Sequence, residues 1–116
     1  MKIKLHLKLM ELKRELNIIA DNMMNLSSGN AARDIPLYRS IIQETKDKLI
    51  NNTINICEDE QIINSLKKIS NNINNVNDTL IREQMTTESI THLANYVRRN
   101  ADEIKTLINL NRKTTT

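Results

Sequence analysis

The chain has 116 residues, of which 39% are hydrophobic and only 2% aromatic, and its formal net charge is +3. This length suits one domain, so we expect a single unit over residues 1–116, with a core built from aliphatic side chains and Met. The lone cysteine excludes an intramolecular disulfide framework and favours a reducing, cytoplasmic setting. No apolar run approaches the length of a membrane span, so we expect none.

The apolar residues of the first segment recur at alternating steps of four and three, which predicts a helix over residues 3–27. They are Leu5, Leu9, Leu12, Leu16, Ile19, Met23 and Leu26. Residues 2–9 and 53–57 also alternate strictly between polar and apolar, which is typical of strands, so a two-stranded pairing is the alternative. An isolated pair of strands is marginal in water, and we therefore favour the helix.

The second predicted helix covers residues 35–56. Asp34 is a good residue to cap its start, and Pro36 then falls in the first turn, where its missing N–H does no harm. Its apolar face consists of Leu37, Tyr38, Ile41, Ile42, Leu49 and Ile50. The pattern weakens through residues 51–53, so we expect fraying or a bend before Cys57.

Two further helices are predicted, over residues 59–84 and 87–111. Glu58, Asp59 and Glu60 suit the start of the first, because the N–H groups at a helix start carry partial positive charge. Its apolar series is Ile62, Leu66, Ile69, Ile73, Val76 and Leu80. Thr86 and Thr87 mark the corner into the last helix, whose series is Ile90, Ala94, Val97, Ala101, Ile104 and Ile108. We expect residues 113–116 to be a disordered tail.

The sequence therefore predicts an all-α fold. Four segments of similar length with short connections favour a four-helix antiparallel bundle. Elongated helical hairpins that complete a core by dimerising use the same apolar series and are the alternative.

Little in the chain suits catalysis or metal binding. His6, Cys57 and His92 are the only nitrogen and sulfur ligands of note, and they lack the close spacings of zinc sites. Adjacent carboxylates such as Asp102 and Glu103 point about 100° apart on a helix and do not converge. A single glycine excludes a glycine-rich phosphate loop. We predict no enzyme, no metal and no cofactor.

Basic residues gather near the two chain ends. In an up-down-up-down bundle the start of the first helix and the end of the last share one end of the molecule, which predicts a basic pole. Its residues are Lys2, Lys4, Lys8, Lys105, Arg112 and Lys113. Such a pole suits phosphate or an acidic partner. The alternative is that cations at the end of the last helix complement its dipole and the others form a solvated face.

Wide aliphatic stripes without large aromatics favour a protein-binding module that holds an amphipathic helix of a partner. We predict contacts at Leu12, Leu16, Ile69, Ile73 and Val76. The most concrete version is a small cytoplasmic chaperone or adaptor of the export or assembly type. The alternatives are a basic nucleic-acid-associated accessory protein of phage or viral type, and a self-assembling structural coiled coil, that is, a homo-oligomer.

Overall fold

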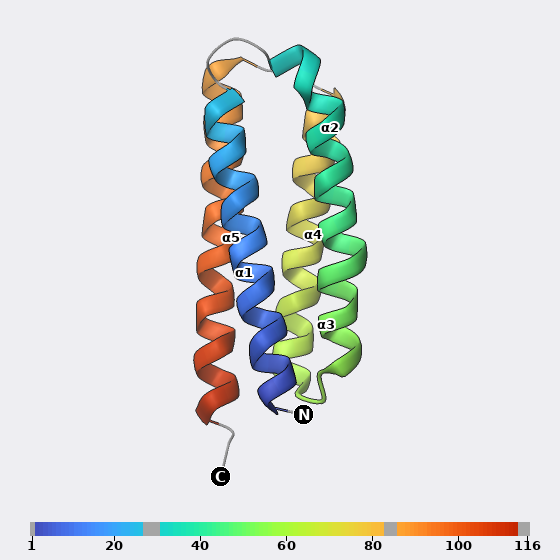
Figure 1. Ribbon diagram of the computed structural model, residues 1–116, viewed down its shortest axis with the longest axis vertical. Coiled ribbons are helices and arrows are strands. Elements are labelled where there is room, and N and C mark those ends of the chain that lie inside the picture. Colours follow the sequence, from blue (N-terminus) through green and yellow to red (C-terminus); the bar gives the residue numbers. More distant parts are fainter. Residues whose placement is uncertain (1, 27–30, 83–85, 114–116) are drawn as a thin grey trace.

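The described part of the chain forms four helical rods (Figure 1). The computed structural model describes residues 2–26, 31–82 and 86–113. The elements are α1 (Lys2–Leu26), α2 (Ala31–Glu44), η1 (Thr45–Ile50), α3 (Asn51–Ile56), α4 (Glu60–Arg82) and α5 (Thr87–Lys113). α2, η1 and α3 follow without a break and form one rod. No strand occurs among the described residues, so residues 2–9 and 53–56 are helical.

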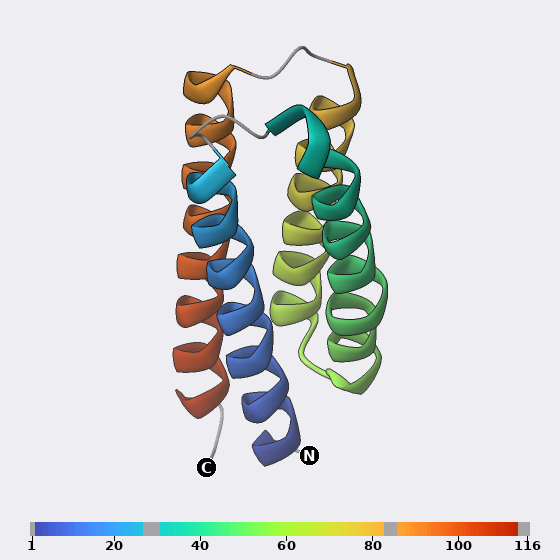
Figure 2. The same cartoon turned by 45° about the horizontal axis from the view of Figure 1, so that its top comes forward.

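The rods run alternately up and down, and the start of α1 and the end of α5 lie at the same end of the molecule (Figure 1). The prediction of an all-α antiparallel bundle is confirmed. The bundle measures 50 × 19 × 17 Å, and α1 and α5 lie side by side along its length (Figures 1 and 2). Ala20, Ala94 and Ala101 are fully buried, and such small side chains allow two helix backbones to approach closely.

The core closes within a single chain. Every rod contributes buried aliphatic side chains, and in α1, α4 and α5 these side chains recur at the predicted four-three spacing. The largest fully buried ones are Leu9, Leu12, Leu16, Ile19, Met23, Ile42, Ile50, Ile62, Leu66, Ile73, Ile90 and Ile104. This fold therefore forms its core without a second copy of the chain, unlike the alternative of elongated hairpins.

The second rod changes its pitch in the middle, and its buried positions explain why. Those positions are Ile42, Thr45, Ile50, Thr53 and Cys57, so one step is five residues long. An α-helix would rotate one end of that step away from the core, whereas the π-helical segment η1, with its i→i+5 bonds, keeps both ends inward. The Asn51 N–H accordingly bonds to the Lys46 carbonyl.

The two buried threonines of this rod satisfy their own hydroxyls. Thr45 Oγ1 donates to the Ile41 carbonyl at 2.9 Å, and Thr53 Oγ1 donates to the Leu49 carbonyl at 2.6 Å. Buried hydroxyls without partners are costly. The rod therefore continues through the weak pattern at residues 51–53 to Ile56, and at Cys57 the backbone becomes extended.

Among the described residues, helix ends differ from the prediction by more than one residue at two places. α2 begins at Ala31, so Pro36 lies inside the helix rather than in its first turn. Ala31 and Ala32, as the best helix formers, extend the helix ahead of Asp34 and tolerate the one bond that Pro36 removes. α5 ends at Lys113, two residues later than predicted. Predicted helical residues 27, 83 and 84, and residues 114–116 of the expected tail, lie outside the described residues.

Side-chain caps fix the starts of α4 and α5. Asp59 Oδ1 accepts from the Gln61 N–H at 2.9 Å and the Ile62 N–H at 3.4 Å. Thr86 Oγ1 accepts from the Ser89 N–H at 3.1 Å. Both caps satisfy N–H groups that have no partner within the helix. The acidic cluster of residues 58–60 thus has the helix-starting role that its position predicts.

Candidate functional site

The five residues predicted to contact a partner all lie in the core. Leu12 and Leu16 are fully buried on α1, and Ile69, Ile73 and Val76 are at most 3% exposed on α4. They fill the bundle interior as members of the buried seams of α1 and α4. A partner helix would reach them only if the bundle opened.

α1 carries a second apolar stripe on its solvent side, which we call the outer stripe. It consists of Ile3, Leu7, Met10, Ile18 and Met24, which are 78%, 60%, 50%, 42% and 39% exposed. At 3.6 residues per turn these positions lie about half a turn from the buried seam. Residues 3, 7 and 10 keep the four-three spacing of a packing surface, and Arg14 occupies its next step. The outer stripe is the strongest candidate for a binding face.

The outer stripe lies on a helix with uneven charge. Residues 2–14 contain five basic residues and one acidic residue, a formal charge of +4, whereas residues 15–26 contain Glu15 and Asp21 and no basic residue, a charge of −2. Lys8 pairs with Glu11 at 3.8 Å and Arg14 with Glu15 at 3.9 Å. Among the described residues, Lys4 and Lys13 make no ion pair. α1 therefore has a basic half and an acidic half.

Helix stability does not explain the basic start of α1. Its first turn contains no acidic residue, and cations at a helix start oppose the partial positive charge there. The basic residues in the last turn of α5, Arg112 and Lys113, do complement the helix dipole. The two halves of the predicted basic pole thus differ, because only the α5 half stabilises its own helix.

The predicted pole is also not uniformly positive. The start of α1 and the end of α5 lie at one end of the bundle, and the turn between α3 and α4 lies at the same end (Figure 1). That turn carries Glu58 and Asp59, and Glu60 follows in the first turn of α4. Lys4, Arg112 and Lys113 are exposed, Lys8 is half-buried one turn further along α1, and Lys105 is exposed about two turns before the end of α5. Of Lys2 the structure describes only the backbone.

A shallow hollow of about 380 Å³ lies beside the middle of the outer stripe, at the edge of α5. Met10 and Ile18 of the stripe line it, together with Lys13, Arg14, Asn17, Asp21 and Ile108. Arg98 of α5 donates to Asp21 Oδ1 and ties the two helices together. The stripe is therefore continuous with a concave surface in which an apolar side chain could rest.

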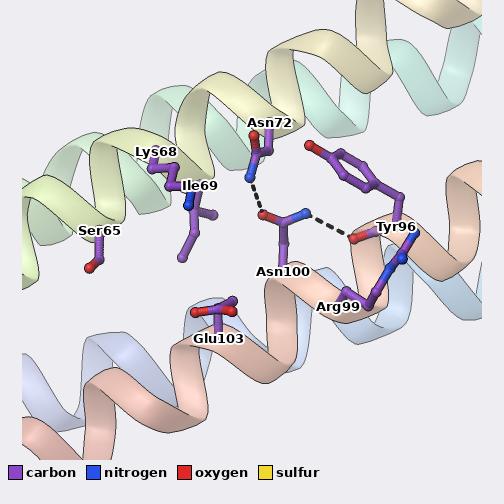
Figure 3. Close-up of a pocket in the computed structure, with 8 residues that line it drawn as sticks. All are labelled: Ser65, Lys68, Ile69, Asn72, Tyr96, Arg99, Asn100 and Glu103. Carbon is purple, nitrogen blue, oxygen red and sulfur yellow. Dashed lines mark hydrogen bonds between the residues drawn. The ribbon is translucent and has the colours of Figure 1, made fainter.

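A polar groove of about 300 Å³ separates α4 from α5 on another side of the bundle (Figure 3). At its centre Asn72 Nδ2 donates to Asn100 Oδ1 at 2.9 Å, and Asn100 Nδ2 donates to the Tyr96 carbonyl at 2.8 Å. Arg99 lies over the Tyr96 ring, 5.8 Å from its centroid. These contacts join the two helices and leave the buried amide of Asn100 satisfied, so a structural role accounts for them.

A second groove lies between α2 and α4 and involves the π-helical segment. Asn77 Nδ2 donates to Gln43 Oε1 at 3.4 Å, and Lys46 Nζ donates to Asn74 Oδ1 at 3.2 Å. Asn77 Oδ1 is buried and has no hydrogen-bond partner among the described residues. Nearby, the hydrogen bond and the charge of Glu44 raise the pKa of Lys48. Several asparagines of α4 thus link helices, a role that their spacing alone does not reveal.

The residues considered for chemistry lie on different elements. His6 is on α1, His92 is on α5, and Cys57 closes the second rod, where it is 7% exposed. Cys57 Sγ donates to the Asp59 carbonyl at 3.6 Å, and burial, ahead of the charges of Asp59 and Glu58, raises the pKa of this thiol. Among the described residues no group of three or more His, Cys, Asp or Glu side chains is placed to hold a metal ion. Nor does any described helix have the length and apolar character that a membrane crossing needs.

Sequence reasoning missed the outer stripe although its signal is present. The strict alternation of residues 2–9 was the basis for the strand alternative. In a helix the same alternation places Ile3 and Leu7 on one face and Leu5 and Leu9 on another. An alternating segment within a helix is therefore apolar on two faces, of which the bundle buries one.

In comparisons with protein-family models, with curated proteins and with solved structures, nothing matches the chain.

Proposed function

We propose that the protein is a non-enzymatic helical module that binds an amphipathic helix along the outer stripe of α1. The observation that carries this proposal is a long apolar stripe exposed on a helix whose core face is already complete. Soluble domains rarely expose contiguous apolar surface without a binding role. Helix addition is the mode that fits, because residues 3, 7 and 10 of the stripe recur at the spacing with which two helices interlock.

The module belongs to the class of small adaptors or chaperones of export or assembly, in which a bundle serves as a rigid support for one binding helix. The proposal places it in the cytoplasm. Support for that setting comes from Cys57, which is a free and buried thiol, since disulfide frameworks mark oxidising compartments.

Site-specific photo-crosslinking in the native cell tests the proposal. A photoreactive amino acid replaces Leu7 in the outer stripe or, as the control, Asn71 on the exposed face of α4. We expect a discrete protein adduct from position 7 and none from position 71. The absence of an adduct at position 7, or the same adducts from both positions, would contradict the proposal.

A nucleic-acid-associated accessory role is the second candidate, and the charge of +4 on residues 2–14 favours it. Glu58, Asp59 and Glu60 at the same end of the bundle weigh against it, because they repel phosphate. Fluorescence anisotropy with labelled duplex DNA and single-stranded RNA at low salt decides between the candidates, since phosphate contacts weaken steeply as salt rises. We expect no saturable binding of either nucleic acid.

A further inference from the structure

We infer that the helix bound along the outer stripe is α1 of a second copy of this chain, packed antiparallel around a two-fold axis. This inference rests on the proposed function, because it names the helix that the stripe receives. It turns the protein into a symmetric dimer in which each copy supplies and accepts the same helix. Such an interface is isologous, so every contact occurs twice.

Charge is the first reason for a second copy in this orientation. The basic half of α1 has a charge of +4 and the acidic half −2. An antiparallel neighbour lays the basic half of each copy along the acidic half of the other, whereas a parallel neighbour lays basic along basic. Charges that flank an apolar seam select orientation and partner in this way in helical pairs. α1 is complementary to itself only when reversed.

The distribution of apolar residues is the second reason. Ile3, Leu7 and Met10 lie in the basic half, and Ile18 and Met24 lie in the acidic half. A reversed copy therefore places apolar side chains of one half against apolar side chains of the other. The axis that maps the stripe onto itself passes near residue 14, so the two Arg14 side chains meet close to it. The same axis places Leu7 opposite the exposed Asp21 of the other copy. The Arg14 pair and this contact are both unfavourable, and they limit the strength of the dimer.

An anionic membrane surface fits the face less well. Its negative charge suits residues 2–14, but Glu15 and the exposed Asp21 lie beside the apolar residues of the other half and would be repelled. A reversed copy satisfies both halves, and flotation with vesicles of phosphatidylserine and phosphatidylcholine separates the two occupants. Flotation of the wild type together with monomeric sedimentation would overturn the inference.

Sedimentation equilibrium of the full chain over a wide concentration range is the first test. We expect a reversible monomer–dimer equilibrium. Leu7→Gln should weaken the dimer about 100-fold, since one leucine contact of roughly 1.4 kcal/mol is lost from each copy. Leu37→Gln is the matched control, because Leu37 on α2 is also 60% exposed and lies off the stripe; it should leave the equilibrium unchanged. Equal effects of the two substitutions would overturn the inference.

Arg14→Leu provides a test in the opposite direction. It completes the four-three spacing of the stripe and removes the like charges near the axis, so the dimer should become at least about tenfold tighter. A partner interface that uses Arg14 to bind an acidic group would instead be weakened. An unchanged or weaker dimer in Arg14→Leu would remove the two-fold arrangement.

Orientation is tested by disulfide trapping. A mixture of the Met10→Cys and Ile18→Cys variants should form the mixed disulfide in preference to either homodimeric one, because an antiparallel pair brings these positions together. Preferential homodimeric disulfides would show a parallel pair. If the wild type sediments as a monomer at all concentrations while position 7 still crosslinks to another protein in cells, this inference fails and the proposed function stands. If neither occurs, both fail.

Discussion

α1 and α4 are long helices of similar length with nearly identical buried seams, yet their solvent faces differ. The outward positions of α4 hold exposed polar residues such as Gln61, Asn64, Lys67, Asn71 and Asp78. Those of α1 hold the outer stripe. The bundle therefore needs only one apolar face per helix, as α4 demonstrates, and the second apolar face of α1 is surplus to folding.

The starts of the two helices differ in the same sense. α4 begins with the Asp59 cap and with Glu60 in its first turn, an arrangement that stabilises a helix. α1 begins with lysines and has no acidic residue in its first turn. Both features that distinguish α1, its second stripe and its basic start, work against an isolated stable bundle, and both suit a binding role.

The largest expected effects come from the buried core faces, which α1 and α4 both have. Leu16→Ala on α1 and Leu66→Ala on α4 each remove a fully buried side chain, so each should lower the free energy of unfolding by about 2–5 kcal/mol. Urea denaturation followed by circular dichroism measures this loss. Leu7→Gln, on the outer stripe, should change it by less than about 0.5 kcal/mol at a concentration where the chain is monomeric. A loss at position 7 as large as at position 16 would show that the stripe belongs to the core.

Substitutions at the starts of α4 and α1 should change the stability of the fold in opposite directions. Asp59→Ala removes two side-chain hydrogen bonds to backbone N–H groups and should cost about 1 kcal/mol of stability. Lys4→Glu places an acidic residue near the start of α1 and should raise stability by about 0.3–1 kcal/mol at low salt. Lys105→Glu is the control for charge reversal, because Lys105 is solvent-exposed and lies away from the start of α5. Thermal unfolding at low and high salt reads out all three, and a destabilising Lys4→Glu would contradict the dipole argument.

The architecture was predictable because periodicity records burial. The seam that contains Leu9, Leu12 and Leu16 and the series that runs through Ile69, Ile73 and Val76 are both in the core, and both follow from spacing alone. The start of α2 and the π-helical step between Thr45 and Ile50 were not predictable, since each results from local competition and packing that a pattern of residue types does not encode.

The candidate site was predictable only in part. Periodicity marks residues that pack but does not distinguish packing within the bundle from packing on a partner, so Leu12 and Ile73 were expected at a surface groove. The placement of the start of α1 and the end of α5 at one end of the bundle followed from an even number of antiparallel helices. The acidic turn beside those ends did not enter the prediction of a basic pole, because its placement depends on where the turn between α3 and α4 lies in three dimensions.

The smallest expected effect concerns Cys57, which closes the second rod beside the start of α4. Burial raises the pKa of its thiol above the ordinary value of 9.0. At a pH between the ordinary pKa and the raised pKa, the folded chain therefore binds more protons than the unfolded chain. Stability should therefore be fully present below pH 9.0 and should fall as the pH rises through that value. The difference in unfolding free energy between the wild type and Cys57→Ala, measured below and above pH 9.0, isolates this contribution from the lysines and tyrosines, which titrate in both proteins. A wild type that gains stability relative to Cys57→Ala at high pH would mean that the thiolate is favoured in the fold, as at an open helix start such as that of α1.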